Sequence, residues 1–134
     1  MAETPKRVHR KVILPRYTPL VGTTPFTSSP LDVRAFAQVL LTGWKGAGIG
    51  ATPADLEFVV QQSPDLEVWL DGTPFSPASA NAEVTRTESL SYAWMRLKAT
   101  VSGADPAITA WMTGEFVLRD DGDGAGAPPP AGAP

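Results

Sequence analysis

The chain has 134 residues, a formal net charge of −3 and no cysteine. This length suits one ordinary domain, and the missing cysteines exclude disulfides, thiolate zinc sites and thiol catalysis. The acidic balance argues against a general nucleic-acid binder, and no apolar run approaches the roughly 18 residues needed to cross a bilayer. No apolar core follows the N-terminal charges, so we see no secretory signal and expect synthesis in the cytoplasm.

Residues 1–30 are basic and rich in proline. Val8, Val12, Ile13 and Leu14 form one candidate strand, but the prolines that follow are expected to end regular structure. We interpret this stretch as an extended arm that reaches a neighbouring subunit and becomes ordered on contact. The alternatives are an edge strand whose charges deter aggregation and a phosphate-binding arm that reads no bases. The arm residues predicted to contact a partner are Arg7, Val8, Arg10, Lys11, Val12 and Ile13.

Residues 120–134 are rich in glycine, alanine and proline and contain three acids. They hold no apolar side chain larger than alanine or proline, so they cannot bury enough surface to offset the entropy lost on ordering. We therefore expect a flexible tail. Asp120, Asp121 and Asp123 superficially resemble a calcium loop, but the bidentate acid at the last loop position is missing.

Apolar and polar residues alternate most clearly in residues 93–101 and 107–119, and this period of two predicts strands with one buried face. Residues 102–106, SGADP, are typical of a turn, so we expect the two strands to form a hairpin. The buried face is predicted to contain Met95, Leu97, Ile108, Met112 and Phe116, and the opposite face to expose Arg96, Lys98 and Glu115.

The other predicted strands cover residues 33–42, 56–62, 67–71 and 82–87. The first two also follow helix-start signatures, a cap, a proline and an acid, at residues 29–32 and 52–55. The second of them is bounded by Pro53 and Pro64 and is too short for a good helix. Short strands at this spacing predict one antiparallel β-sandwich over residues 31–119, with an α+β fold as the alternative.

Residues able to carry catalysis are scarce. His9 is the single histidine, so a Ser-His-Asp triad would depend on the arm, and no nucleophile-elbow motif supplies the serine. Asp65, Glu67 and Asp71 form an acidic cluster, which we interpret as turn chemistry after Pro64 rather than paired-acid catalysis. We predict no catalytic residue, no bound metal and no cofactor.

Trp94 and Trp111 both lie on the polar side of their alternating strands. In a hairpin the two rings would lie near each other on the outer face of a sheet. Such a pair forms either an aromatic platform for a sugar or an anchor in a protein interface. Alternatively, a second sheet or the arm covers that face.

Two patterns carry a family resemblance. In residues 56–71 a strand ends in Gln-x-Ser-x-Asp and a tryptophan follows shortly afterwards. The second is the strand WMRLKA, residues 94–99, followed by a turn that contains glycine. Together they resemble small all-β proteins of tailed bacteriophages and phage-like particles. The residues of the first pattern are Gln61, Ser63, Asp65 and Trp69.

This resemblance covers residues 31–119 and implies a jelly-roll-like sandwich that decorates a capsid or joins virion parts. It also favours strands over helices at residues 33–42 and 56–62, and it transfers no active-site residues. We therefore expect a structural or assembly protein, capsid-associated or accessory (decoration or connector), without catalytic activity. Its expected partners are capsid or other virion subunits and further copies of itself in a homo-oligomer, with no specific nucleic acid and no membrane. Its expected location is the virion, after synthesis in the bacterial cytoplasm. A carbohydrate-binding module that uses the surface tryptophans is the alternative.

Overall fold

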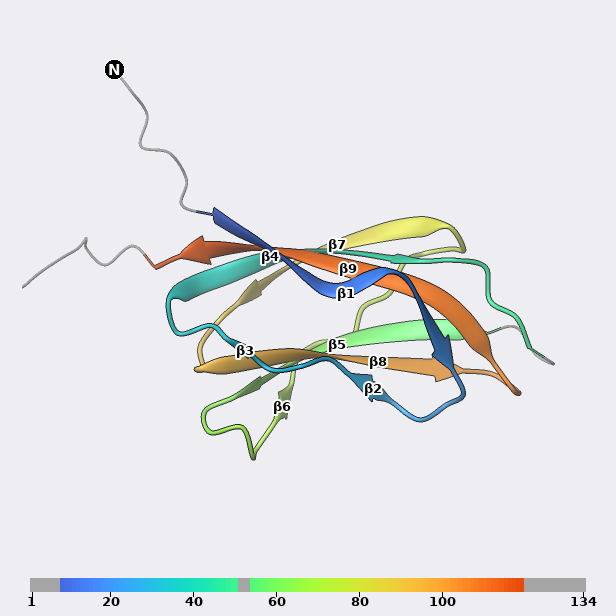
Figure 1. The fold of residues 1–134 in the computed structure, drawn as a ribbon, viewed down its shortest axis with the longest axis horizontal. Coiled ribbons are helices and arrows are strands. Elements are labelled where there is room, and N and C mark those ends of the chain that lie inside the picture. Colours follow the sequence, from blue (N-terminus) through green and yellow to red (C-terminus); the bar gives the residue numbers. More distant parts are fainter. Residues whose placement is uncertain (1–7, 51–53, 120–134) are drawn as a thin grey trace, which may run out of the picture.

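The computed structural model describes residues 8–50 and 54–119, which form two antiparallel β-sheets packed face to face (Figure 1). The four-stranded sheet has the order β1 (Val8–Val21), β9 (Ala107–Leu118), β4 (Phe36–Lys45) and β7 (Ala82–Ser89). The five-stranded sheet has the order β2 (Phe26–Thr27), β8 (Trp94–Ser102), β5 (Asp55–Ser63) and β6 (Leu70–Asp71), and β3 (Leu31–Asp32) also pairs with β8. Among these residues no helix is long and apolar enough to cross a membrane.

The strand order is that of a jelly roll. β2 and β3 both pair with β8, so they act as two parts of one interrupted strand, and the nine strands reduce to eight. In chain order, the first, eighth, third and sixth of these form one sheet, and the second, seventh, fourth and fifth form the other. This is the double-sheet arrangement of eight-stranded jelly rolls. The predicted all-β sandwich is therefore confirmed, and the α+β alternative is wrong for the described residues.

The core lies between the sheets and is lined by the face that alternation predicts. All five residues predicted for the buried face have exposed fractions of 4% or less. The three polar residues of the opposite face are half-buried rather than fully exposed, because neighbouring strands and loops flank them. The confirmed core residues are Met95, Leu97, Ile108, Met112 and Phe116, and the half-buried ones are Arg96, Lys98 and Glu115.

The predicted hairpin of residues 93–101 and 107–119 is wrong. β8 pairs with β5 in one sheet, whereas β9 pairs with β1 and β4 in the other. The connection carries the chain across the sandwich, with positive φ angles of 127° at Gly103 and 49° at Asp105. Alternation identifies the buried face of a strand but not the strand beside it, so it cannot distinguish a hairpin from a crossing between sheets.

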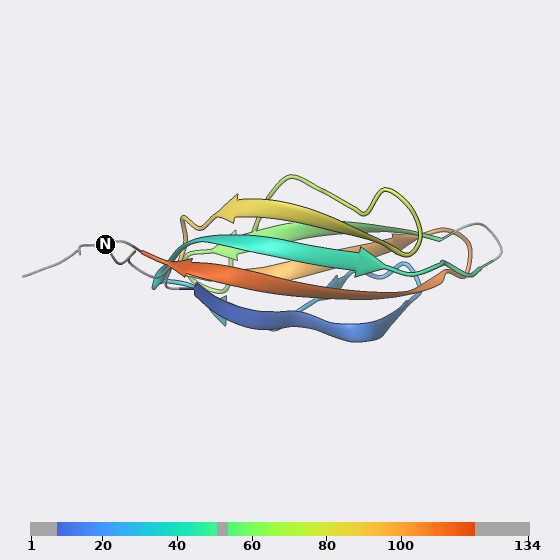
Figure 2. The ribbon, with the colours of Figure 1, turned by 90° about the horizontal axis from the view of Figure 1, so that it is seen from above.

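Residues 8–21, predicted to belong to a separate arm, form β1 at one edge of the four-stranded sheet (Figure 2). The register with β9 shifts between Val12 and Leu14 and again between Leu14 and Thr18, so the strand continues past Pro15 through a bulge. Prolines are tolerated because an edge strand can turn the missing N–H away from its partner. The predicted boundary at residue 30 is therefore wrong, and the sandwich includes β1. Residues 1–7 and the tail of residues 120–134 lie outside the described part.

The acids of the two helix-start signatures have other partners in the fold. The carboxylate of Asp32 accepts hydrogen bonds from the guanidinium of Arg34, at 2.6 and 3.0 Å, and from its backbone N–H at 3.1 Å. Asp55 accepts hydrogen bonds from Lys45 Nζ at 2.7 Å and from the backbone N–H of Leu56 at 2.8 Å. The segments that follow become β4 and β5, as the resemblance implied, because strand pairing satisfies their backbone groups.

Candidate interaction surface

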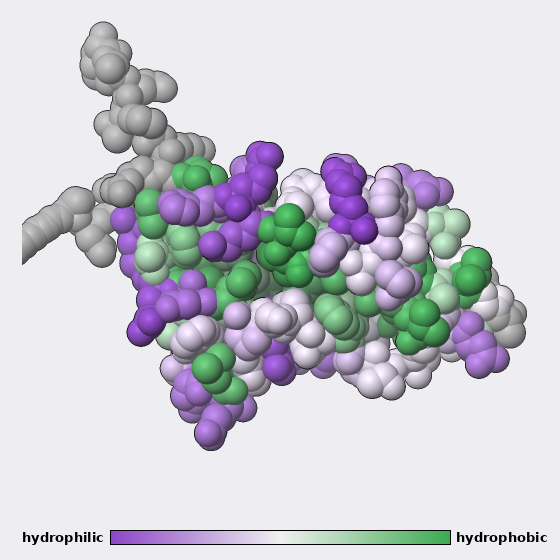
Figure 3. Space-filling model, viewed as in Figure 1, coloured by the Kyte–Doolittle hydropathy of each residue, from purple (hydrophilic) through white to green (hydrophobic). Residues whose placement is uncertain are grey.

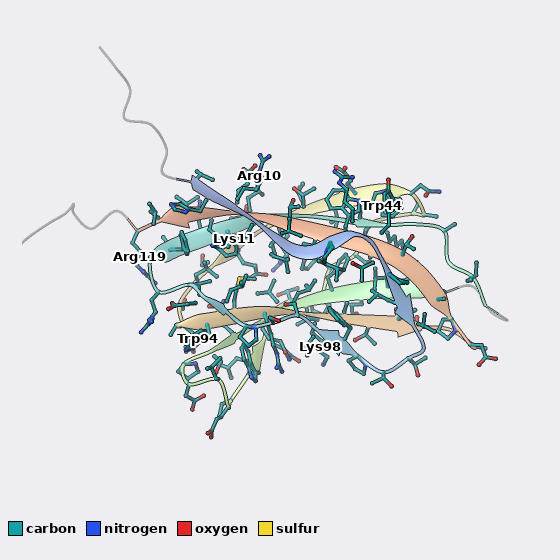
Figure 4. All side chains as sticks on the ribbon, in the orientation of Figure 1. Arg10, Lys11, Trp44, Trp94, Lys98 and Arg119 are labelled. Atoms are coloured by element: carbon teal, nitrogen blue, oxygen red, sulfur yellow. The ribbon has the colours of Figure 1, made fainter. Side chains whose placement is uncertain are left out.

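The predicted tryptophan pair does not form. Trp94 opens β8 in the five-stranded sheet (Figure 4). Trp111 lies in β9 of the four-stranded sheet. Each alternates with core residues, Met95 and Met112, so each ring lies on the outer face of its own sheet. The two outer faces point in opposite directions, so no single ligand can stack on both rings. The two-ring platform predicted for a sugar is therefore wrong.

Trp111 is covered by β1 and is only 5% exposed. The bulge of β1 places the guanidinium carbon of Arg16 4.5 Å from the centre of the indole ring. The next residue, Tyr17, has a positive φ of 59°. Its ring meets the ring of Trp44 edge-on, with 5.7 Å between the ring centres, and Trp44 is the cross-strand partner of Trp111. The alternative interpretation, in which the N-terminal segment covers this face, is therefore confirmed for Trp111.

Two of the arm residues predicted to contact a partner make contacts within the chain, and a third is not described. Arg7 lies outside the described residues. Ile13 packs into the core. Arg10 points away from the sandwich and pairs with Glu115 at 2.6 Å on an exposed face (Figure 4). An exposed ion pair of this kind contributes little to stability.

Val8, Lys11 and Val12 remain on the surface of β1. Val12 is 63% exposed. Lys11 lies opposite Gly114 in β9, and a side chain at Gly114 would point toward the core residues. Paired residues of an antiparallel ladder project to the same side of the sheet, so the aliphatic part of Lys11 lies at the edge of the gap between the two sheets. Its ammonium group has no ion-pair partner in the part of the chain that the structure describes. These three residues are the part of the predicted set that could contact a partner.

An apolar groove follows the open side of the sandwich, where β1 faces β2 and β3 across the gap between the two sheets (Figure 3). Its volume is about 420 Å³, and no charged residue lines it. At its base the hydroxyl of Ser28 accepts a hydrogen bond from the backbone N–H of Leu97 at 2.8 Å. We call it the seam groove. Its main lining residues are Val12, Leu14, Pro15, Phe26, Ser28 and Leu31.

A second surface is the loop before β6, where the structure shortens the strand predicted at residues 67–71. The hydroxyl of Ser63 accepts hydrogen bonds from the next two backbone N–H groups after Pro64, at 3.1 and 2.8 Å. Asp65 Oδ1 accepts hydrogen bonds from the backbone N–H of Val68 at 3.0 Å and of Glu67 at 2.9 Å. These bonds, that from Val68 first, lower the pKa of Asp65. The interpretation of the acids as turn chemistry is confirmed for Asp65.

Two further side chains anchor this loop to the five-stranded sheet. The guanidinium carbon of Arg96 lies 4.1 Å from the ring centre of Trp69, and its Nε donates to Gln61 Oε1 at 2.7 Å. Gln61 in turn donates to Asp71 Oδ1 at 2.7 Å. We call residues 64–71 the acidic loop, which projects from the five-stranded sheet away from the four-stranded one (Figure 1). Three aliphatic side chains of the acidic loop are exposed, Leu66 by 43%, Val68 by 56% and Leu70 by 43%.

The described residues hold no group of three histidine, cysteine, aspartate or glutamate side chains placed to bind a metal ion. His9 is exposed and meets the ring of Phe36 edge-on at 5.5 Å. The acidic run of residues 120–123 lies outside the described part.

No protein-family model, curated protein or solved structure matches this chain. The surfaces described above are therefore the basis for a functional proposal.

Sequence reasoning found Val12 and Ile13 on the β1 side of the seam groove but missed the side formed by residues 26–31. Phe26 and Leu31 are isolated apolar residues in a proline-rich stretch, and no periodicity marks them as neighbours of β1. For the acidic loop a signal was visible. Apolar residues alternate with Glu67 and Trp69 between the acids Asp65 and Asp71, which is an unusual composition for a solvated turn.

Proposed function

We propose that this chain is a structural subunit without catalytic activity, held in a phage or phage-like particle as a capsid-associated or accessory protein. The observation that carries the proposal is the seam groove, an apolar and open surface beside an edge strand of a jelly roll. Jelly rolls are common in viral capsid domains. The resemblance of residues 31–119 to small phage proteins supports the same class.

The lining of the seam groove favours a protein contact over a reaction. Catalysis needs an acid, base, nucleophile or metal at the wall of the site, and the groove wall offers only aliphatic, aromatic and hydroxyl groups. Edge strands with apolar pockets beside them are a recurring docking surface for other polypeptides. Val12, one of the lining residues, is 63% exposed, so the apolar surface of the groove is open to a partner.

Mass spectrometry of particles purified from the source strain tests this proposal. We expect the chain in intact particles, and we expect Val12→Asp to be folded by circular dichroism yet depleted from them. The matched control is Ile49→Asp, which alters an equally exposed aliphatic residue outside the groove. Absence of the wild-type chain from intact particles, with the protein in the soluble lysate, contradicts the proposal.

Carbohydrate binding is the second candidate, because lectin domains also use jelly rolls. The structure moves the candidate residues from Trp94 and Trp111 to Tyr17, Trp44 and Arg16, where an exposed tyrosine and a half-exposed indole lie beside a guanidinium. Titration of tryptophan fluorescence with a panel of glycans tests it. A response that Tyr17→Ala abolishes supports sugar binding, and no response to any glycan contradicts it.

A further inference from the structure

We propose that copies of this chain associate head to tail, with the acidic loop of one copy seated in the seam groove of the next. This inference rests on the proposed function, because it names the contacting partner as a second copy of the same chain. Three observations carry it: the shape of the loop, the distribution of unpaired charge, and the positions of the two surfaces in the fold.

The acidic loop presents apolar side chains on a backbone that is already fixed. The side chains of Ser63 and Asp65 together accept four hydrogen bonds from backbone N–H groups within the loop. The guanidinium of Arg96 packs on the ring of Trp69. Leu66, Val68 and Leu70 nevertheless remain exposed. A preformed loop loses little conformational entropy when it docks, so its apolar surface can contribute to binding almost in full. The uncharged lining of the seam groove is a matching receptor for such side chains.

Unpaired charges of opposite sign surround the two surfaces. Beside the seam groove, Lys11 on β1 has no ion-pair partner among the described residues (Figure 4). In the acidic loop, the carboxylates of residues 65, 67 and 71 are likewise outside any described ion pair. The pairs that do form use Arg10 with Glu115, Arg34 with Asp32, Lys45 with Asp55, and Arg86 with Glu88.

This charge pattern gives the contact a direction. A lysine beside an apolar groove attracts an acidic loop and repels the same lysine of a second copy, so groove-to-groove pairing is disfavoured. The loop-to-loop alternative places three acids against three acids and is disfavoured for the same reason. Only the unlike surfaces complement each other.

The two surfaces belong to different edges of the five-stranded sheet. In the order β2-β8-β5-β6, the seam groove lies at the β2 edge of the five-stranded sheet and the acidic loop at the β6 edge. These edges are separated by three strand spacings, about 14 Å. A contact between unlike surfaces of two copies leaves one loop and one groove unused, so it continues into a ring or a filament.

Light scattering after size-exclusion chromatography of the full chain tests the inference. We expect wild type to form species larger than a monomer as concentration rises, with weaker association at high salt because salt screens the attraction between Lys11 and the acidic loop. Val68→Asp in the acidic loop and Val12→Asp at the groove should each weaken association about tenfold or more. Ile49→Asp, which changes an exposed aliphatic side chain that belongs to neither surface, should associate as wild type does.

Mixing the two variants is the decisive measurement. Val68→Asp retains an intact groove and Val12→Asp retains an intact loop, so the mixture should give a one-to-one heterodimer that does not grow further. An isologous contact would not produce this result, because it needs the same surface on both copies. Association of either variant alone at the wild-type level, or failure of the mixture to form the heterodimer, overturns the inference.

A reciprocal charge exchange provides a second measurement that does not introduce a charge into an apolar surface. Lys11→Glu and Glu67→Lys should each reduce association, and the double variant should recover most of it. No recovery overturns the placement of Glu67 of one copy beside Lys11 of the next. The proposed function fails separately: a chain that is monomeric at every concentration but present in intact particles removes the self-contact and leaves the structural role in place.

Discussion

The two edges of the four-stranded sheet, β1 and β7, are built in opposite ways. β7 pairs with β4 through eight residues without a register shift, and an ion pair joins Arg86 to Glu88 along the strand. β1 is longer, shifts register twice, contains Pro15 and Pro19, and leaves Val12 exposed beside the seam groove.

The contrast shows two ways of managing a strand edge. Charged side chains along β7 make it a poor template for an incoming strand, which is the usual protection against aggregation. β1 interrupts its own edge with a bulge and prolines but keeps apolar surface next to it. We infer that β7 is the protected edge, and β1 is the edge at which we propose the contact.

If the β1 bulge covers Trp111 on the outer sheet face, removing that side chain should cause one of the largest losses of stability. Trp111→Ala is expected to lower the free energy of unfolding by about 3–5 kcal/mol, the usual range for truncating a buried large aromatic side chain. The control is Trp94→Ala, whose half-exposed ring should cost clearly less. Urea denaturation measures both, and equal losses would contradict a covering role for β1.

The substitution Leu14→Ala tests whether β1 contributes to the stability of the sandwich. Leu14 is fully buried, so we expect a loss of about 2–3 kcal/mol, in the lower half of the range for buried leucine because an edge strand can relax around the cavity. Val12→Ala on the same strand should change stability by less than about 0.5 kcal/mol. Similar small values for both variants would restore the separate-arm interpretation.

The ion pairs of the two edges should differ in strength. Glu88 is well shielded in its pair with Arg86, whereas Glu115 and Arg10 on the β1 side are open to solvent. We expect Glu88→Gln to cost about 1 kcal/mol and Glu115→Gln less than about 0.5 kcal/mol. Thermal unfolding at low and high salt measures both, and the reverse order would contradict the assignment of β7 as the charged, protected edge.

The smallest expected effect is at Asp32, next to the seam groove on β3. Hydrogen bonds from the guanidinium of Arg34 lower the pKa of Asp32 from 3.8 to about 2. The folded chain therefore binds fewer protons than the unfolded chain in this interval. The contribution of the pair is present above pH 3.8 and is lost as pH falls toward about 2. An NMR titration of the carboxyl group should show this pKa, and Arg34→Gln should raise it. An unchanged value in that variant would contradict the pairing.

Local chemistry in the sequence determined the strand phase, much of the core and one turn. Residues such as Leu97 and Phe116 are buried because alternation places them opposite polar neighbours, and this holds whichever strand lies beside them. The turn after Ser63 was predictable for the same reason, since the hydroxyl and the Asp65 carboxylate satisfy backbone groups only a few residues away.

Tertiary structure alone decided which strands pair and which surfaces remain open. β8 and β9 are adjacent in sequence and equally alternating, yet they pack in opposite sheets because the core is filled from two sides. Trp94 and Trp111 are separated by that same choice. The seam groove exists because β1 and residues 26–31, irregular in sequence and rich in proline, end at facing edges of the two sheets. Pairing and edge exposure are long-range properties, set by how whole sheets stack, so no local pattern encodes them.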